Sequence, residues 1–237
     1  MTRRRWIADE VVGDRAFLRG STSYHLARVL RARVGQVFDV VAEGRLCQGR
    51  VASVSAERVE LDLADEVPAG DLQLEITLLL SIFKFDRMEW ALEKATELGV
   101  SAIVPIIARR TEAHLASAAA KRRDRWERIV HDAAQQARRV SVPEIFAPMK
   151  LKHGLTDRKA GIVLSESEQD SSLIQMLREM GSPHAVALAF GPEGGWTNDE
   201  LENFLKAGWR AASLGKTILR AETAVIAALA VTVAELT

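Results

Sequence analysis

The sequence predicts an α/β protein with two parts, a small β-barrel followed by a larger parallel sheet with helices on both faces. In residues 36–67, apolar and polar residues alternate in short segments, as in the strands of a small barrel. From residue 74 onward, apolar strands and amphipathic helices alternate, as in a parallel sheet. Between them, residues 68–71 (PAGD) break both patterns and predict a linker.

The first part is expected to form three main strands and one short helix. The predicted strands are 36–44, 45–55 and 58–67. Glu43 and Gly44 fit the tight turn of a hairpin between the first two. The helix is predicted over residues 21–33, because Leu26, Val29 and Leu30 fall at helical spacing.

The second part reads as five strands and four helices in alternation. The predicted strands are 72–84, 101–108, 161–167, 185–190 and 210–215. The predicted helices are 86–98, 119–138, 197–207 and 221–235. Asp86 with Glu89 and Thr197 with Glu200 have the spacing of capping boxes, which would fix two helix starts.

Composition excludes several classes of protein. The chain has 237 residues, 48% of them hydrophobic, and no formal net charge, as expected for a globular protein. Its single cysteine, Cys47, excludes an internal disulfide framework and a cysteine-built metal site, and no metal is predicted. No apolar run is long enough to span a membrane, and no apolar stretch follows the basic start. We therefore expect a cytoplasmic protein without a membrane partner.

The basic residues are unevenly distributed. Residues 1–50 contain ten arginines and no lysine, against five acidic residues, and a second basic stretch runs from Arg109 to Arg139. Such stretches on a neutral chain are typical of a surface that binds a polyanion. Long cationic side chains that only solvate the surface are an equally good interpretation of either stretch alone.

Two glycine-bearing turns follow predicted strands near the C-terminus, at residues 191–195 and 214–219. The Gly-Lys-Thr at 215–217 is not a P-loop, because Arg210 stands where that motif requires its first glycine. Ligands of parallel sheets bind beyond the carboxyl ends of the strands, and glycines allow close backbone approach. The turns therefore predict a ligand site, although tight strand–helix connections would explain the first turn equally well.

Arg220 and Glu222 stand at the start of the apolar helix predicted over 221–235. Charged residues seldom enter a buried segment without a partner. An exposed first helical turn, in which Glu222 interacts favourably with the helix dipole, is the alternative.

Six segments of the chain resemble one known family. They are HLARVLRARVGQVFDVV, KFDRMEWALEKATELGV, ARRTEAH, QQARRVSVPEI, FGPEGGWTNDEL and LGKTILRAETA. In this order they are similar to the RsmE family of 16S ribosomal RNA uridine methyltransferases, over nearly the whole chain. One departure lies at Gln135, where the family often has glutamate.

The resemblance implies a fold, a reaction and partners. It implies a PUA-like RNA-binding β-barrel at residues 1–70 and a SPOUT-type domain with a C-terminal trefoil knot at 71–237. It also implies a homodimer, S-adenosyl-L-methionine as cofactor, and methylation of N3 of a uridine in 16S rRNA of the small subunit or its precursor. A SPOUT enzyme with another RNA target and a non-catalytic RNA-binding assembly protein are the alternatives.

Site residues follow from matching the family's motifs to this chain. The predicted catalytic residues are Arg220, to stabilise the uridine anion, and Glu193 or Glu222, to accept the proton or orient the arginine. The predicted cofactor-binding residues are Leu164, Phe190, Gly191, Gly194, Gly195, Leu214, Gly215, Ile218, Leu219 and Thr223. The predicted RNA-binding residues are Arg3, Arg4, Arg5, Arg28, Arg31, Arg33, Arg109, Arg110, Arg138 and Arg139.

Overall fold

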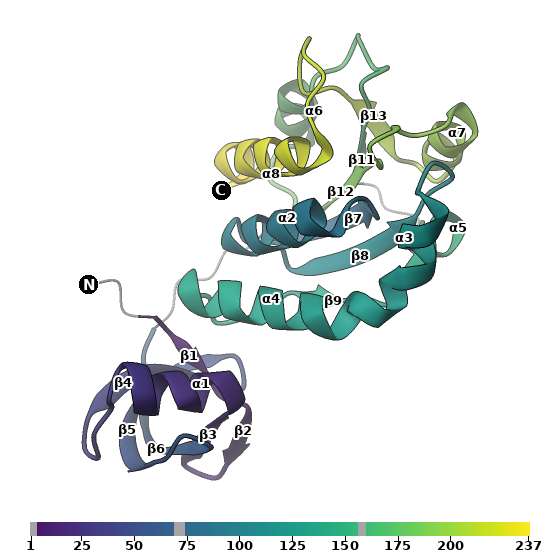
Figure 1. Ribbon diagram of the computed structural model, residues 1–237. Helices are drawn as coiled ribbons and strands as arrows, with labels where there is room; N and C mark the ends of the chain where they lie inside the picture. Colours follow the sequence, from purple (N-terminus) through teal and green to yellow (C-terminus); the bar gives the residue numbers. More distant parts are fainter. Residues whose placement is uncertain (1–3, 69–73, 156–159) are drawn as a thin grey trace. The chain divides into compact units, whose positions relative to one another are not determined.

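The computed structural model describes residues 4–68, 74–155 and 160–237, and the chain divides into two compact units (Figure 1). Unit 1 contains the chain up to residue 71 together with residues 134–141. Unit 2 contains residues 72–133 and 142–237.

Unit 1 is built on a six-stranded, barrel-like sheet. Its strands are β1 (Trp6–Ile7), β2 (Glu10–Val12), β3 (Arg15–Arg19), β4 (Val37–Ala42), β5 (Arg45–Val54) and β6 (Arg58–Glu66). Their order is β1-β4-β5-β6-β3-β2, with β1 parallel to β4 and the other pairs antiparallel. The three main strands predicted from the sequence are thus confirmed. Glu43 and Gly44 both have positive φ, 51° and 78°, as a two-residue hairpin turn requires.

The helix of unit 1 is shorter than predicted. It consists of α1 (Gly20–Tyr24) and a π-helical turn, η1 (His25–Val29), closed by the bond from the Leu30 N–H to the His25 carbonyl. Leu26 is fully buried, but Val29 and Leu30 are 60% and 48% exposed. The prediction that Val29 and Leu30 share a buried face with Leu26 was wrong, because the wider π turn changes the angular spacing of the side chains after Leu26.

Residues 134–141 pack within unit 1 although they lie far along the chain. The buried Gln135 side-chain oxygen accepts a hydrogen bond from the Ile7 N–H at 3.4 Å. Arg138 lies 3.5 Å from Asp39, and Val140 packs in a small apolar cluster with two residues of the sheet. Gln135, where the family often has glutamate, therefore makes a hydrogen bond to the first strand.

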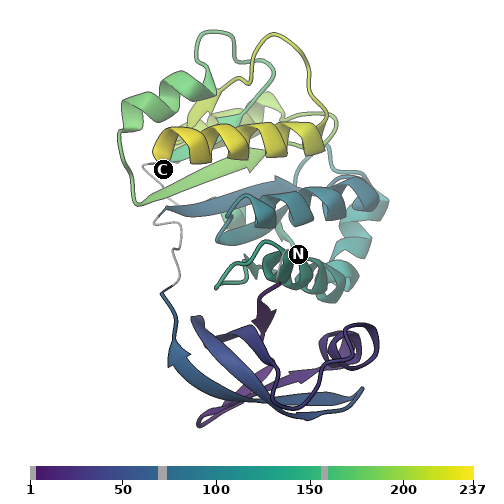
Figure 2. The same cartoon turned by 90° about the vertical axis from the view of Figure 1, so that its left-hand side faces the viewer.

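Unit 2 contains a seven-stranded sheet in which every pairing is parallel (Figure 2). Its strands are β7 (Glu75–Ser81), β8 (Ala102–Ile107), β9 (Glu144–Ile145), β10 (Met149–Lys150), β11 (Gly161–Leu164), β12 (Ala185–Phe190) and β13 (Arg210–Ala212). Their order is β10-β8-β7-β12-β11-β13, and β9 also pairs with β8. The parallel sheet predicted from the alternation of strands and helices is confirmed.

Helices cover both faces of this sheet. They are α2 (Phe85–Glu97), α3 (Ala113–Ala118), the 3-10 turn η2 (Ala119–Arg122), α4 (Arg123–Gln136), α5 (Leu151–Gly154), α6 (Leu173–Met180), α7 (Asn198–Lys206) and α8 (Ala221–Leu236). The helices α2, α4, α6 and α8 pack in one apolar cluster, and α5 and α7 in the other. Figures 1 and 2 both show α2 and α8 side by side. In the described part of the chain, no helix has the length and apolar character needed to cross a bilayer.

Alternate residues of the central strands face the two clusters, as the side-chain period of a strand dictates. On β12, Leu188 and Phe190 contribute to the cluster of α2 and α8, whereas Ala187 and Ala189 contribute to the other. Phe204 of α7 lies between the rings of two tryptophans in that second cluster, at 4.9 and 5.1 Å between centroids. The small alanines of β12 leave room for this bulky aromatic layer.

One predicted helix start is confirmed and another was wrong. Thr197 and Glu200 form a capping box at α7. At α2 the N-cap is Lys84, without a side-chain cap, and Glu89 instead pairs with two arginines that follow α3, at 3.3 and 2.8 Å. The long helix predicted over 119–138 is also divided, because η2 interrupts the α-helical turns.

The chain crosses the carboxyl end of β11 before it enters α8. Strand β13 lies beyond β11 at the edge of the sheet, whereas α8 packs on α2 and α6. In this crossing, backbone hydrogen bonds join Ser213 to the segment after β11. The Ser213 N–H donates to the Ser171 carbonyl, and the Leu173 N–H donates to the Ser213 carbonyl, both at 2.9 Å. The predicted trefoil knot would form here, and it stays a prediction.

Candidate active site

Three loops start side by side at the carboxyl edge of the sheet of unit 2. Leu164, the last residue of β11, is level with Phe190 at the end of β12 and with Ala212 at the end of β13. We name the loops that follow the β11 loop (165–172), the glycine loop (191–196) and the C-terminal loop (213–220). Parallel pairing therefore brings together segments that are far apart in sequence, as in other parallel sheets that bind ligands at this edge.

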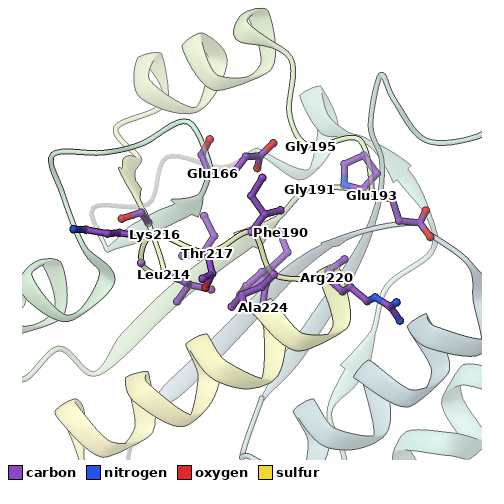
Figure 3. Close-up of a pocket in the computed structure, with 18 of the residues that line it drawn as sticks. Glu166, Phe190, Gly191, Glu193, Gly195, Leu214, Lys216, Thr217, Arg220 and Ala224 are labelled. Carbon is purple, nitrogen blue, oxygen red and sulfur yellow. The ribbon is translucent and has the colours of Figure 1, made fainter.

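The three loops and the start of α8 enclose a cavity of about 410 Å³, within the usual range for a small-molecule site. Figure 3 shows Glu166 on one side of it and Glu193 with Arg220 on another. The residues that line it are Arg87, Leu164, Ser165, Glu166, Phe190, Gly191, Pro192, Glu193, Gly195, Ser213, Leu214, Gly215, Lys216, Thr217, Ile218, Leu219, Arg220, Ala221 and Ala224.

The glycine loop approaches Glu166 closely. Gly195 has a φ of +68°, which strongly favours glycine, and a Cβ at this position would lie 2.2 Å from Glu166 Oε1. A Cβ at Gly191 would lie 3.3 Å from the Gly195 backbone. The indole N–H of Trp196 donates to the Leu164 carbonyl at 3.2 Å and so joins the loop to β11. The glycines thus permit a narrow cavity wall that larger residues would obstruct.

Charged side chains meet at one end of the cavity. Arg87, in the first turns of α2, has its Nη1 4.0 Å from Glu193 Oε1 and its Nε 3.8 Å from Glu222 Oε1. Arg87 and Glu193 are each about one-third exposed, whereas Glu222 is almost fully buried. Two carboxylates on different elements therefore share one guanidinium, and the neighbouring Arg220 supplies a second positive charge.

The position of Glu222 follows from the helix that carries it. Helix α8 begins at Ala221, with Arg220 in extended conformation as its N-cap. A carboxylate in the first turn interacts favourably with the unpaired N–H groups and the dipole of a helix N-terminus. Within the described residues, Glu222 Oε2 is buried without a hydrogen-bond partner, and Arg87 supplies the counter-charge beside Oε1. Of the two interpretations of the start of this helix, the structure supports the buried, paired glutamate.

Most of the predicted site residues lie together. The predicted residues that line the cavity are Leu164, Phe190, Gly191, Glu193, Gly195, Leu214, Gly215, Ile218, Leu219 and Arg220. Three of the predicted residues do not line the cavity. Glu222 pairs with Arg87, which does line it. Thr223 is exposed, and Gly194 faces the side chain of Arg110. Their assignment as catalytic or cofactor-binding residues stays a prediction.

The sequence interpretation missed several lining residues. They are Arg87, Ser165, Glu166, Pro192, Ser213, Lys216, Thr217, Ala221 and Ala224. Glu166 could have been found, because the strand predicted over 161–167 ends at the same sheet edge as the two glycine turns. Arg87 could not, because nothing in its helix indicates that its side chain turns toward Glu222.

The predicted RNA-binding arginines fall into three groups, and Arg3 lies outside the described residues. Arg28, Arg31 and Arg33 of unit 1 are exposed, as is Arg4. Arg5, Arg138 and Arg139 make contacts within unit 1: Arg5 donates to the Arg138 carbonyl, Arg138 pairs with Asp39, and Arg139 donates to Ser141. Arg109 and Arg110 lie in unit 2, on the loop after β8. Their role in RNA binding stays a prediction.

Comparison with known proteins places this chain in a family. A model described as an RNA methyltransferase domain matches residues 70–233. The ribosomal RNA small subunit methyltransferase E of Synechocystis sp. is 30% identical over 228 residues, which are 94% of this chain and 74% of that protein. The protein of the same name from Bacillus subtilis is 29% identical over 220 residues, 89% of this chain and 86% of that protein.

The chain belongs to the ribosomal RNA small subunit methyltransferase E family.

Solved structures agree with the family assignment. A crystal structure of ribosomal RNA small subunit methyltransferase E from Neisseria gonorrhoeae, bound to S-adenosyl methionine, is similar with a TM-score of 0.83 and 31% identity. That match covers 96% of this chain and 95% of the other. A Legionella pneumophila protein in complex with the bound cofactor SAM matches with a TM-score of 0.84 and 28% identity, over 98% and 97% of the two chains. The predicted family and fold class are confirmed.

We expect Arg87 and Glu222 to be energetically coupled. Arg87→Ala should lower the free energy of unfolding by about 1–2 kcal/mol, because it leaves a buried carboxylate without its counter-charge. Glu222→Gln should remove part of that penalty, so that the double variant loses less stability than the sum of the single variants. Urea denaturation of all three variants measures the coupling.

Arg123→Ala serves as the matched control. Arg123 pairs with Glu127 within one helix, and both side chains are about half exposed to solvent. The substitution should change the free energy of unfolding by at most about 0.5 kcal/mol. Strictly additive effects of Arg87→Ala and Glu222→Gln would contradict the coupling.

Proposed function

We propose that this protein uses S-adenosyl-L-methionine to methylate N3 of a uridine in 16S ribosomal RNA, within the small subunit or its precursor. The observation that supports this most is the cavity at the carboxyl edge of the sheet, with Arg87, Glu193 and Arg220 at one end. The names of the family members agree with a ribosomal RNA substrate, and two structural matches contain the cofactor.

The residues of the cavity fit the proposed cofactor. Apolar walls from Phe190, Leu214 and Leu219 suit a flat adenine ring, and the glycine loop leaves space that a Cβ at Gly195 would fill. Glu166 supplies a carboxylate that can accept hydrogen bonds from ribose hydroxyls or an ammonium group. When bound there, S-adenosylmethionine would supply an electrophilic methyl group on a sulfonium.

The chain's own part in the chemistry is to favour the uridine anion. N3 of uridine is protonated near neutral pH, so its proton has to leave before the nitrogen can attack a methyl group. Arg220 and Arg87 would stabilise the negative charge that develops on the base, because guanidinium groups stay charged. Arg220 lines the cavity and is itself exposed, so a nucleotide can approach it from solvent.

The two glutamates are proposed to have different roles. Glu193 lines the cavity and is one-third exposed, so it can accept the N3 proton and release it to water. Glu222 is buried and does not line the cavity, so it would act as a positioning residue that orients Arg87.

We also propose that the protein works as a homodimer in the cytoplasm. Apolar residues occupy every side of α8, and Ile226, Ala227 and Val233 remain partly exposed within one chain. Trp90, on the neighbouring α2, is 46% exposed. Cover by a second copy would remove this apolar surface from water. Light scattering should report twice the 26.1 kDa mass of the chain.

Methyl transfer from labelled S-adenosylmethionine to small subunits tests the proposed function. The expected product blocks reverse transcription at one uridine of 16S rRNA, because a methyl group on N3 prevents Watson–Crick pairing. Label in another RNA, or at another atom, would favour a SPOUT enzyme with a different target. RNA binding without any transfer would favour the non-catalytic assembly protein.

The pH dependence of single-turnover methylation should separate Glu193 from Glu222. Glu193→Gln should slow transfer by about a hundredfold at neutral pH, because the proton acceptor is lost. That defect should shrink toward alkaline pH, where solvent can remove the N3 proton. Glu222→Gln should slow transfer by a factor that does not change with pH, and the reverse assignment of the two profiles would contradict these roles.

RNA affinity is expected to depend on exposed arginines of unit 1. Replacing Arg28, Arg31 and Arg33 with alanine should weaken RNA binding and lower its salt dependence by roughly one unit of slope per lost phosphate contact. A variant without Arg15 and Arg58 is the control, because these arginines already pair with Asp62 and Glu60 of β6 at 3.2 and 3.1 Å. An unchanged slope in the triple variant would contradict this, and the basic stretch at 109–139 would have to bind the RNA alone.

A further inference from the structure

The loop after β8 is bonded directly to the glycine loop. Arg110 Nη1 donates to the Gly194 carbonyl at 2.6 Å and to the Trp196 carbonyl at 3.2 Å. A Cβ at Gly194 would press against the Arg110 side chain at 3.3 Å from Cδ. We infer that Arg110 is a positioning residue for the cofactor cavity, an inference that rests on the proposed function of that cavity.

Arg110 can hold the glycine loop because its own backbone is fixed. Thr111 Oγ1 accepts from the Ala108 N–H at 3.1 Å and donates to the Ile82 carbonyl at 3.3 Å, and Thr111 N–H donates back to the Ala108 carbonyl. These bonds close a tight turn at the end of β8. The backbone that carries the Arg110 guanidinium is therefore held in place. A side chain can orient another loop only if its own backbone is fixed in this way.

A second contact ties the same two segments together through Glu200. This buried carboxylate accepts from the Arg109 backbone N–H at 2.8 Å and from the Thr197 N–H at 2.9 Å. It thus joins the turn after β8 to the start of α7, which follows the glycine loop directly. Because this contact uses the Arg109 backbone, it survives replacement of the side chain at either 109 or 110.

The two carbonyls that Arg110 holds flank Gly195. One guanidinium nitrogen bonds the residues before and after a glycine whose φ is +68°. The Gly194 carbonyl belongs to the peptide group that sets this φ, and the Trp196 carbonyl belongs to the peptide group after Trp196, so the two bonds hold the chain on both sides of Gly195. Gly195 lines the cavity beside Glu166. A loop held in its binding conformation loses less conformational entropy when a ligand binds. Arg110 should therefore raise cofactor affinity without touching the cofactor.

Arg109 and Arg110 form a natural matched pair. They are adjacent, equally charged and both exposed on the same turn. Within the described part of the chain, the Arg109 side chain makes no hydrogen bond or ion pair, whereas Arg110 makes two hydrogen bonds to the glycine loop. A phosphate contact and a positioning contact can therefore be separated by changing one residue at a time.

The experiment compares Arg110→Ala, Arg110→Lys and Arg109→Ala. Calorimetric titration with S-adenosylmethionine should show affinity weakened on the order of tenfold or more in Arg110→Ala, as for loss of charge-assisted hydrogen bonds. Arg110→Lys should recover part of it, because an ammonium can donate to both carbonyls. Arg109→Ala should keep cofactor affinity and, if Arg109 binds RNA, lower the salt slope of RNA binding by about one.

Kinetics and hydrogen exchange complete the test. Arg110→Ala should raise KM for S-adenosylmethionine and leave KM for RNA unchanged, and amide exchange at Gly195 and Trp196 should speed up without cofactor. Normal cofactor affinity in Arg110→Ala together with a lower RNA salt slope would overturn the inference. If the unmodified protein does not bind S-adenosylmethionine, the proposed function fails, while unchanged exchange in Arg110→Ala would refute the positioning role separately.

Discussion

Parallel pairing of β12, β11 and β13 is the constraint on which the rest of the site depends. It aligns Leu164 with Phe190 and Ala212, so three loops from distant parts of the chain leave the sheet at one edge. The cavity exists because these exits are neighbours and because the glycine loop can turn at Gly195 without a side chain. Both apolar clusters of unit 2 stabilise this alignment, since the three strands contribute side chains to each face.

Two arginines adapt this general architecture to particular chemistry. Arg87 connects α2 with Glu193 of the glycine loop and with Glu222 of α8, which places charges from three elements at one end of the cavity. Arg110 holds the glycine loop through its carbonyls and brings no charge into the cavity lining. Arg87 thus belongs to the proposed reaction and Arg110 to the shape of the site, although both are long cations on unit 2.

The sequence predicted the elements from local patterns, and it predicted ten of the nineteen residues that line the cavity from the two glycine turns and the family's motifs. Alternation of strands and helices is sufficient for a parallel sheet, and residues after its strands gather at one edge. The π turn at His25–Val29 and the pairing of Glu89 with arginines after α3 were missed, because each depends on tertiary contacts that a local pattern does not contain. Arg87 was missed for the same reason, because its partners Glu193 and Glu222 lie more than one hundred residues further along the chain.

The narrow wall at Gly195 forms part of the proposed cofactor cavity. Gly181 offers a control, because its φ of +70° nearly equals the +68° of Gly195, yet no atom lies within 4 Å of a Cβ there. Alanine at either position should cost on the order of 1–3 kcal/mol of stability from backbone strain. Calorimetric titration with S-adenosylmethionine should show affinity at least about tenfold weaker in Gly195→Ala, where the methyl group displaces Glu166, and unchanged in Gly181→Ala. Equal affinity in the two folded variants would contradict the account.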